Sequence, residues 1–112
     1  WLTEEELKVY VSEYERTGFQ GGLNWYRSGG SSGNRENLEL FSGMKIANPA
    51  MFIAGRQDWG IFQRPGAINK MKNEVCTNMG EIQLVDNAGH WVQQEQPESV
   101  LKLLLDFLGE IG

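Results

Sequence analysis

The sequence has little of what several classes of protein require. Its 112 residues include a single cysteine, Cys76, and a single histidine, His90, so an internal disulfide is excluded. No further cysteine or histidine stands at the spacing of a metal site, and we expect neither a metal nor another cofactor. The scarcity of cysteine is typical of a reducing compartment, which favours a cytoplasmic protein.

Basic charge and long apolar runs are also scarce. Ten Lys and Arg residues stand against fifteen Asp and Glu residues, which gives a formal net charge of −5. Because no basic run is present, we expect no nucleic-acid partner. No apolar run approaches the roughly 18 residues of a membrane span, and the acidic start "WLTEEELK" is unlike a signal peptide. We therefore expect a soluble protein without a membrane partner.

The first segment with a clear pattern is "LTEEELKVYVSEYERTG". Its apolar side chains recur at the spacing of one helical face: Leu7, Tyr10, Val11 and Tyr14. Thr3 and Glu6 form a capping-box pattern at the start, and Gly18 suits a left-handed helix end. The segment is predicted to be an amphipathic helix with both ends marked.

The following stretch has a weaker pattern. It predicts a short aromatic segment, a flexible stretch at residues 28–34 and a short helix over about Arg35–Phe41. Residues 28–33, "SGGSSG", suit an engineered linker and a natural surface loop equally well, because glycine and serine lower chain stiffness in both.

The second half changes to the pattern of an α/β protein. "PAMFIAG" and "EIQLVDN" are predicted strands, and "RPGAINKMKNEV" between them is a predicted helix. A right-handed crossover would make the two strands parallel neighbours. The last segment, "PESVLKLLLDFLGEI", is predicted to be a helix whose apolar stripe covers the sheet. That stripe comprises Val100, Leu103, Leu104, Phe107, Leu108 and Ile111.

Two polar residues follow the two predicted strands. Asp58 comes just after the first strand and His90 just after the second, 32 positions later. Because ligands bind beyond the carboxyl ends of parallel strands, we expect the two side chains to meet at one edge of the sheet. A carboxylate beside one imidazole nitrogen leaves the other nitrogen free to act as a base. Asp86 is a rival acid, and simple packing of His90 is the alternative role.

Large aromatic residues flank the polar candidates. Trp59 follows Asp58, and Trp91 follows His90. Large aromatic residues usually pack in the core, which is the expected role of each tryptophan taken singly, and a water-poor pocket around the polar pair is the alternative. Cys76 lies in the predicted connection between the strands, where a buried, inert thiol is expected rather than a nucleophile.

Three motifs together carry a family resemblance. "GFQGGLNWYR", "FIAGRQDWG" and "DNAGHWVQQEQPE", followed by "LLLDFL", resemble the C-terminal part of an α/β-hydrolase of the epoxide hydrolase group. The resemblance extends from about Leu2 to Ile111. It implies that residues 1–27 are the C-terminal tail of a helical cap, or lid, domain. Residues 28–112 would be the C-terminal part of the catalytic domain, with two parallel strands and flanking helices.

The resemblance also implies roles for matching residues. His90 resembles the base that activates water, Asp58 the acid that orients it, and Tyr26 in "NWYR" one of two lid tyrosines that polarise the epoxide oxygen. Trp59 and Trp91 would contact the substrate, a small apolar epoxide that becomes a vicinal diol through an aspartyl ester.

Other parts of the family pattern are absent from these residues. The nucleophile elbow, the oxyanion-hole motif and the second lid tyrosine would belong to an N-terminal part of the same hydrolase, which is therefore the expected partner. The isolated chain is expected to be inactive, and a homo-oligomer is left open. Two alternatives also stay open: part of another α/β-hydrolase, such as a haloalkane dehalogenase or a serine esterase, and a non-catalytic interaction module.

Overall fold

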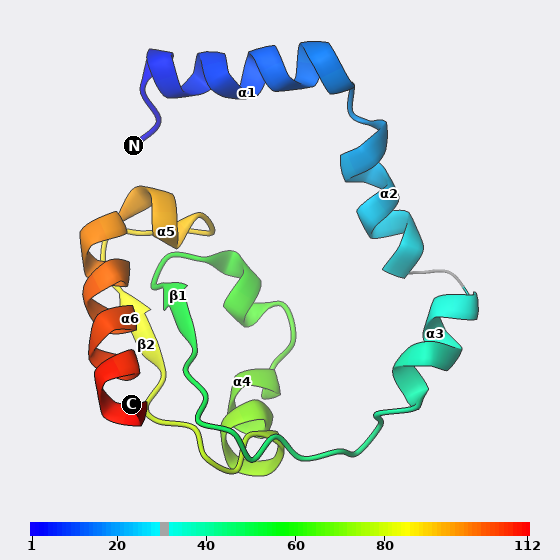
Figure 1. Ribbon diagram of the computed structural model, residues 1–112, viewed down its shortest axis with the longest axis vertical. Helices are drawn as coiled ribbons and strands as arrows, with labels where there is room; N and C mark the ends of the chain where they lie inside the picture. The colour runs from blue at the N-terminus through cyan, green and yellow to red at the C-terminus, as the bar shows by residue number, and fades with distance from the viewer. Residues whose placement is uncertain (30–31) are drawn as a thin grey trace. The chain divides into compact units, whose positions relative to one another are not determined.

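The computed structural model describes residues 1–29 and 32–112, which form two compact units (Figure 1). The first unit, Trp1–Met44, consists of helices, and the second, Lys45–Gly112, contains the sheet. The boundary between the two units, after Met44, differs from the lid boundary expected near residue 27. The lid boundary concerns function and stays a prediction.

Helix α1 (Glu4–Thr17) begins and ends where the sequence predicts. The backbone N–H of Glu6 donates to the Thr3 hydroxyl at 3.2 Å, and the backbone N–H of Thr3 donates to the Glu6 carboxylate at 2.8 Å. At the other end Gly18 has a φ of 67°, and its N–H donates to the Tyr14 carbonyl. The predicted capping box and the end of the helix at Gly18 are confirmed, but the predicted left-handed helical conformation is wrong, because the ψ of Gly18 is −179°.

The apolar face of α1 is only partly covered. Its members are 40–47% exposed, compared with 62% for Val9 on the other side of the helix: Leu7, Tyr10, Val11 and Tyr14. The ring of Tyr14 stacks on that of Phe19, with centroids 4.4 Å apart. No residue of α1 is buried. The described part of the chain therefore leaves much of this face exposed.

Two further helices differ from the prediction. The aromatic segment forms α2 (Gln20–Gly29), although glycines normally weaken a helix; the Gln20 side-chain amide donates to Asn24 one turn later at 2.8 Å. Helix α3 (Ser32–Glu39) begins before the expected Arg35 and ends before Phe41. The flexible stretch expected at 28–34 is thus helical at 28–29 and 32–34, and residues 30–31 lie outside the described residues.

The second unit contains two short parallel strands, as predicted. Strands β1 (Ile53–Gly55) and β2 (Gln83–Val85) pair in the register Ile53 with Gln83 and Gly55 with Val85. Two isolated parallel bridges, Ile46 with Cys76 and Ala50 with Met79, extend the pairing toward the beginning of both segments. The regular strands are therefore shorter than the apolar runs that predict them.

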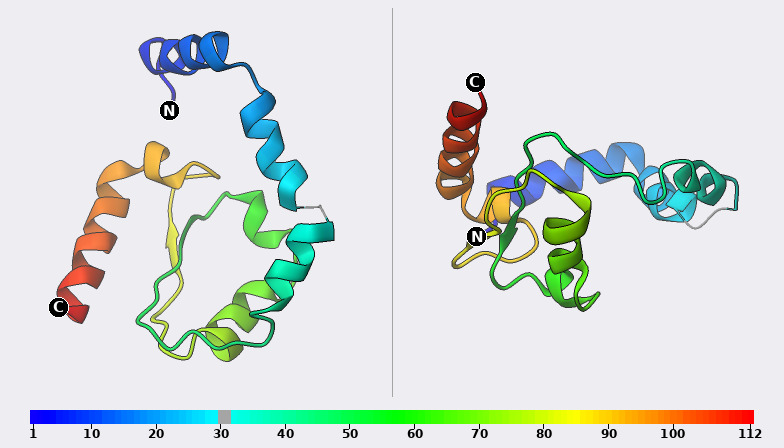
Figure 2. Two further views of the ribbon diagram at one scale, coloured as in Figure 1. Left: turned by 45° about the vertical axis from the view of Figure 1, so that its right-hand side comes forward. Right: turned by 90° about the horizontal axis from the view of Figure 1, so that it is seen from below.

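Helices connect and flank these strands. After β1 the chain forms a 3₁₀ turn, η1 (Trp59–Phe62), then α4 (Ala67–Lys70) and the π-helical turn η2 (Met71–Val75). After β2 come α5 (Val92–Glu95) and α6 (Pro97–Ile111). Figures 1 and 2 show α6 and the α4–η2 segment on opposite sides of the strands. This confirms the predicted strand–helix–strand order and two flanking helices.

The small core lies between these elements. Its most buried apolar residues are Ala54, Cys76, Val85, Ala88 and Val100. The stripe of α6 is covered less than predicted, because Leu103 and Phe107 are half-buried whereas Leu104, Leu108 and Ile111 are exposed. A two-stranded sheet is too narrow to cover the whole stripe. Among the described helices, none has the length and apolar character needed to cross a membrane.

The capping box predicts a pH-dependent start of α1. The backbone N–H and then the hydroxyl of Thr3 donate to the Glu6 carboxylate, and both lower the pKa of Glu6 from its usual value. The resulting stabilisation is complete above the unfolded-state pKa and is lost as the pH falls through the lower folded-state pKa. A ¹³C-NMR titration of the Glu6 carboxyl should show this low pKa.

Thr3→Ala should raise the pKa of Glu6 because it removes the hydroxyl donor. Ser12→Ala removes a hydroxyl elsewhere on α1 and serves as the control, with the Glu6 titration unchanged. An equal pKa in the parent chain and Thr3→Ala would contradict the assignment of the hydroxyl.

Candidate functional site

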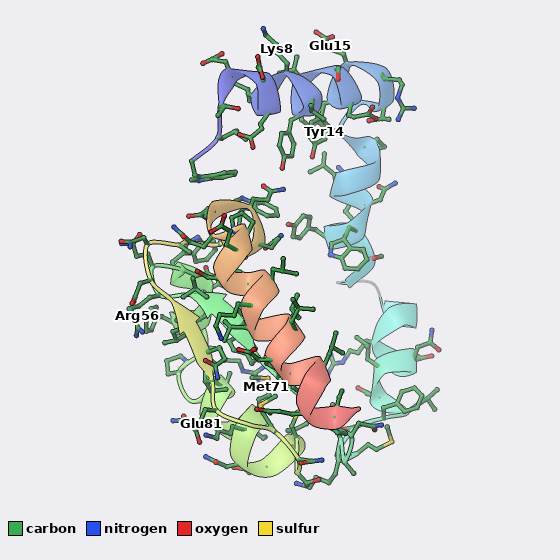
Figure 3. All side chains as sticks on the ribbon, turned by 60° about the vertical axis from the view of Figure 1, so that its left-hand side comes forward. Lys8, Tyr14, Glu15, Arg56, Met71 and Glu81 are labelled. Atoms are coloured by element: carbon green, nitrogen blue, oxygen red, sulfur yellow. The ribbon has the colours of Figure 1, made fainter. Side chains whose placement is uncertain are left out.

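The loops that follow the two strands are tied to each other by backbone hydrogen bonds. The N–H of Arg56 donates to the Val85 carbonyl, and the N–H of Gln57 donates to the Ala88 carbonyl, both at 2.9 Å. Arg56, labelled in Figure 3, also pairs through its guanidinium with Asp86 and donates to the Leu84 carbonyl. These contacts hold the segment after β2 against the end of β1.

The crossing of the two loops requires glycine at position 55. A Cβ atom there would lie 2.2 Å from the carbonyl oxygen of Gly89 and 2.3 Å from that of Ala88, far inside van der Waals contact. These obstructing atoms belong to the backbone, which cannot rotate aside as a side chain would. The absence of a side chain at Gly55 therefore lets the segment before His90 cross the end of β1.

Asp58 is held rigidly in the loop after β1. Asp58 is only 8% exposed, and its backbone N–H donates to the Gly55 carbonyl at 3.1 Å. Its side chain caps η1, because Oδ1 accepts the backbone N–H of Gly60 at 2.7 Å. Gly60 leaves room for this contact, since a Cβ atom there would lie 2.9 Å from Oδ1. The carboxylate is thus anchored before it meets any other side chain.

The structure brings Asp58 and His90 together. Nδ1 of His90 lies 3.2 Å from both carboxylate oxygens of Asp58. An ionised carboxylate only accepts hydrogen bonds, so this contact requires the proton of the neutral imidazole on Nδ1. The opposite nitrogen, Nε2, then carries a lone pair on a side chain that is 57% exposed. This arrangement suits a base that takes a proton from water.

The rival acid, Asp86, has a different partner. Its carboxylate pairs with the Arg56 guanidinium, and both side chains are mostly exposed. Sequence proximity made Asp86 a candidate, but it lies on the strand-end turn beside Asn87, whose φ is 56°. The carboxylate that reaches the imidazole is that of Asp58.

Two tryptophans lie against the imidazole. The ring of Trp59 is roughly parallel to that of His90, with centroids 6.4 Å apart, and the ring of Trp91 meets it edge-on at 5.3 Å. Both residues are more than half exposed, so neither belongs to the core of the described residues. The expectation that they contact a substrate stays a prediction.

A hollow of about 400 Å³ opens beside the acid–histidine pair. Asp58 and His90 contribute to its lining together with two other polar residues, Gln63 and Arg64, and the remaining lining residues are apolar. Its lining includes Phe52, Asp58, Ile61, Ile68, Met71 and His90. An apolar hollow with a few convergent polar groups is typical of small-molecule sites. In the described part of the chain, no three His, Cys, Asp or Glu side chains are grouped to hold a metal ion.

Tyr26 lies in the first unit, on α2. It is 80% exposed and, with Trp25, lines a second hollow of about 350 Å³. The other members of that lining are Tyr14, Phe19, Gly22 and Leu23. The described residues do not bury Tyr26 in a core, and its catalytic role stays a prediction.

Sequence comparison gives close relatives over nearly the whole chain. Epoxide hydrolase A of Mycobacterium tuberculosis is 42% identical over 109 residues, a match that covers 96% of this chain and 32% of the relative. The bifunctional epoxide hydrolase 2 of Rattus norvegicus is 34% identical, with 95% of this chain and 18% of the relative covered. No protein-family model matches the chain.

Structure comparison leads to the same group. Potato (Solanum tuberosum) epoxide hydrolase I has a TM-score of 0.84 at 32% identity, and epoxide hydrolase A from Mycobacterium thermoresistibile has a TM-score of 0.78 at 44% identity. These matches cover 98% and 96% of this chain but only 35% and 32% of the solved chains. The chain is homologous to the C-terminal portion of epoxide hydrolases. It spans about a third of the length of the Mycobacterium tuberculosis relative and less than a fifth of the rat relative, and its predicted α/β-hydrolase fold is confirmed.

Sequence reasoning missed residues whose contribution depends on contacts between segments. Gly55 and Gly60 stand in the quoted motif "FIAGRQDWG", but only the structure shows which atoms approach them. Glu95 stands in "DNAGHWVQQEQPE", and its carboxylate accepts the N–H of Gly89 and that of Trp91. A carboxylate shortly after a histidine loop is too common a pattern to predict these two bonds.

The glycine crossing leads to a stability prediction. Gly55→Ala should lower the free energy of unfolding by about 3 kcal/mol or more, because overpacking against backbone exceeds the usual cost of a crowded core. Gly109→Ala is the matched control: a Cβ there meets no described atom within 4 Å, and alanine favours a helix over glycine by about 1 kcal/mol. Urea unfolding of both variants is the measurement. If Gly55→Ala were as stable as Gly109→Ala, the backbone of residues 88 and 89 would not be as close to position 55 as the structure has it.

Proposed function

We propose that this chain supplies the acid–histidine pair and one lid tyrosine of an epoxide hydrolase, which opens an epoxide to a vicinal diol. The observation that carries the proposal is the contact of His90 Nδ1 with the anchored carboxylate of Asp58 beyond the ends of two parallel strands. Homology to epoxide hydrolases supports the choice of substrate class.

The first chemical step opens the epoxide ring. An aspartate nucleophile, on an N-terminal part of the same hydrolase, attacks one epoxide carbon, and the bond from that carbon to the ring oxygen breaks. The ring oxygen becomes an alkoxide, which needs a proton or a strong hydrogen-bond donor. The phenol of Tyr26, with a second lid tyrosine of the N-terminal part, stabilises that charge.

The second step hydrolyses the resulting ester. Nε2 of His90 takes a proton from water, and the hydroxide attacks the ester carbonyl. Collapse of the tetrahedral intermediate frees the leaving oxygen, which takes the proton back from His90, and leaves the nucleophile as aspartic acid. The acid proton passes through solvent to the oxygen that became an alkoxide in the first step, which restores the aspartate and completes the diol. Asp58 holds the imidazole in the required tautomer and stabilises the imidazolium that forms. Trp59 and Trp91 provide apolar walls beside the reacting water.

The exposed apolar surfaces support a partner for the chain. Half of the α6 stripe and the apolar face of α1 are exposed among the described residues. Burial of apolar area is favourable at roughly 25 cal/mol per Å², so these faces favour association with the remaining strands and helices of a hydrolase. In the proposal, residues 1–27 complete the lid, residues 28–112 complete the catalytic domain, and the isolated chain is inactive.

The first test concerns His90. In the complete hydrolase that contains this chain, His90→Gln should lower turnover of a simple aryl epoxide by about 10²–10⁴-fold, because the water loses its base. Steady-state diol formation is the measurement, and Gly109→Ala on α6 is the control with parent activity. Intact-mass analysis of the sample reveals any second polypeptide. Turnover by His90→Gln at the parent rate would refute the role of the histidine.

The second test concerns Tyr26. Tyr26→Phe should slow ring opening by about ten- to a hundredfold and leave ester hydrolysis much less affected, because the phenol acts where the alkoxide forms. Single-turnover kinetics separate the two steps. Tyr14→Phe removes the same hydroxyl from α1 and should behave like the parent. If ring opening in Tyr26→Phe keeps the parent rate, Tyr26 is not the electrophile.

A further inference from the structure

Side chains hold the imidazole of His90 only loosely, because the two tryptophan rings that lie against it are themselves more than half exposed. The side chain of His90 is more than half exposed, and its contact with Asp58 is 3.2 Å to each oxygen, near the long end of a hydrogen bond. A small change in the direction in which the Cα–Cβ bond of His90 points would lengthen the distance from Nδ1 to the carboxylate beyond that of a hydrogen bond. The position of the ring therefore depends on how firmly the backbone on each side of His90 is held.

One side chain holds the backbone N–H groups of both residues that neighbour His90. The N–H of Gly89 donates to Glu95 Oε2 at 2.7 Å, and the N–H of Trp91 donates to Glu95 Oε1 at 3.0 Å. Glu95 itself is half-buried at the end of α5. Because the two bonds lie on either side of His90 and use both carboxylate oxygens, they form a clamp around that residue.

The clamp is more than a helix cap. The bond to Trp91 satisfies an N–H at the start of α5, as a cap would, but Gly89 lies outside that four-residue helix. Gly89 also leaves room for the carboxylate, since a Cβ atom there would lie 3.3 Å from Glu95 Oε1. A cap alone would require neither the Gly89 bond nor this space.

We propose that Glu95 is a positioning residue whose carboxylate binds the backbone N–H groups of the residues before and after His90 and so keeps the imidazole on Asp58. Its kinetic consequence rests on the proposed function: loss of the clamp slows ester hydrolysis, the step that needs His90, and leaves ring opening at the parent rate. Glu95 contacts no substrate in this role and acts only through the histidine.

Two variants of graded severity test the clamp in the complete hydrolase. Glu95→Ala removes both acceptors, whereas Glu95→Gln keeps the volume and one acceptor oxygen but turns an amide donor toward the other N–H. Misplacement of a catalytic group by about 1 Å costs up to about a hundredfold in rate. Single-turnover kinetics should therefore show ester hydrolysis slowed by about ten- to a hundredfold in Glu95→Ala and by less in Glu95→Gln.

A matched control separates the clamp from a general effect of charge. Glu98→Gln neutralises an exposed carboxylate in the first turn of α6 and should leave both steps at the parent rate. Equal slowing of ring opening and ester hydrolysis in the Glu95 variants would overturn the proposal, because general destabilisation affects both steps. If Glu95→Ala does not fold, the same comparison is made with Glu95→Gln.

A second readout does not depend on activity. With ¹⁵N-labelled histidine, and the His90 signal assigned by its loss in His90→Gln, the Nδ1–H resonance reports the bond to Asp58. That resonance should shift or broaden in the Glu95 variants and stay unchanged in Glu98→Gln. An unchanged His90 resonance in Glu95→Ala overturns the clamp. If the parent hydrolyses no epoxide, the proposed function fails, whereas this spectrum still decides the role of Glu95.

Discussion

The geometry of the candidate site depends on the close crossing of two loops at Gly55. The carbonyl oxygens of Ala88 and Gly89 occupy the space where any other residue at position 55 would place its Cβ atom. The Ala88 carbonyl accepts the N–H of Gln57 at the same crossing, and Ala88 itself is completely buried. The loop that carries Asp58 and the loop that carries His90 are therefore positioned by one shared backbone contact.

Local anchors then orient the side chains on these loops. The Asp58 carboxylate accepts the N–H of Gly60, and the Asp58 backbone N–H donates to the Gly55 carbonyl. The residues before and after His90, Gly89 and Trp91, donate their backbone N–H groups to the carboxylate of Glu95. Backbone N–H groups thus hold each partner of the acid–histidine pair before the two side chains meet. Such preorganisation removes the cost of ordering the pair during a reaction.

The structure around the site buries few apolar side chains. The core of the described residues is small, and much of the apolar surface of α6 and α1 is exposed. A pair of short strands offers too little surface to cover the apolar stripe of α6 among the described residues. Asp58, His90 and the residues that hold them all lie in the continuous segment Lys45–Gly112, which forms one compact unit.

Periodicity and end signals predicted the regular elements well where the physical cause is local. The capping box at Thr3, the proline at the start of α6 and the apolar runs of β1 and β2 depend on neighbours in sequence. Prediction was poorer for α2 and α3, where side-chain pairs along the helix, such as Gln20 with Asn24, offset glycine and serine content. Propensity is a weak prior in such segments.

The sequence by itself determined α1, the two strands with a helical segment between them, and α6. It also determined the two strand ends at which Asp58 and His90 stand, because hydrophobic period and turn residues are properties of short segments. Only the tertiary structure decided that Asp58 rather than Asp86 meets the imidazole, and that the backbone of residues 88 and 89 crosses Gly55. The physical reason is that a hydrogen bond or a steric clash between residues 30 or more positions apart depends on distances of a few tenths of an ångström. The pattern of side chains along a chain carries no such distances.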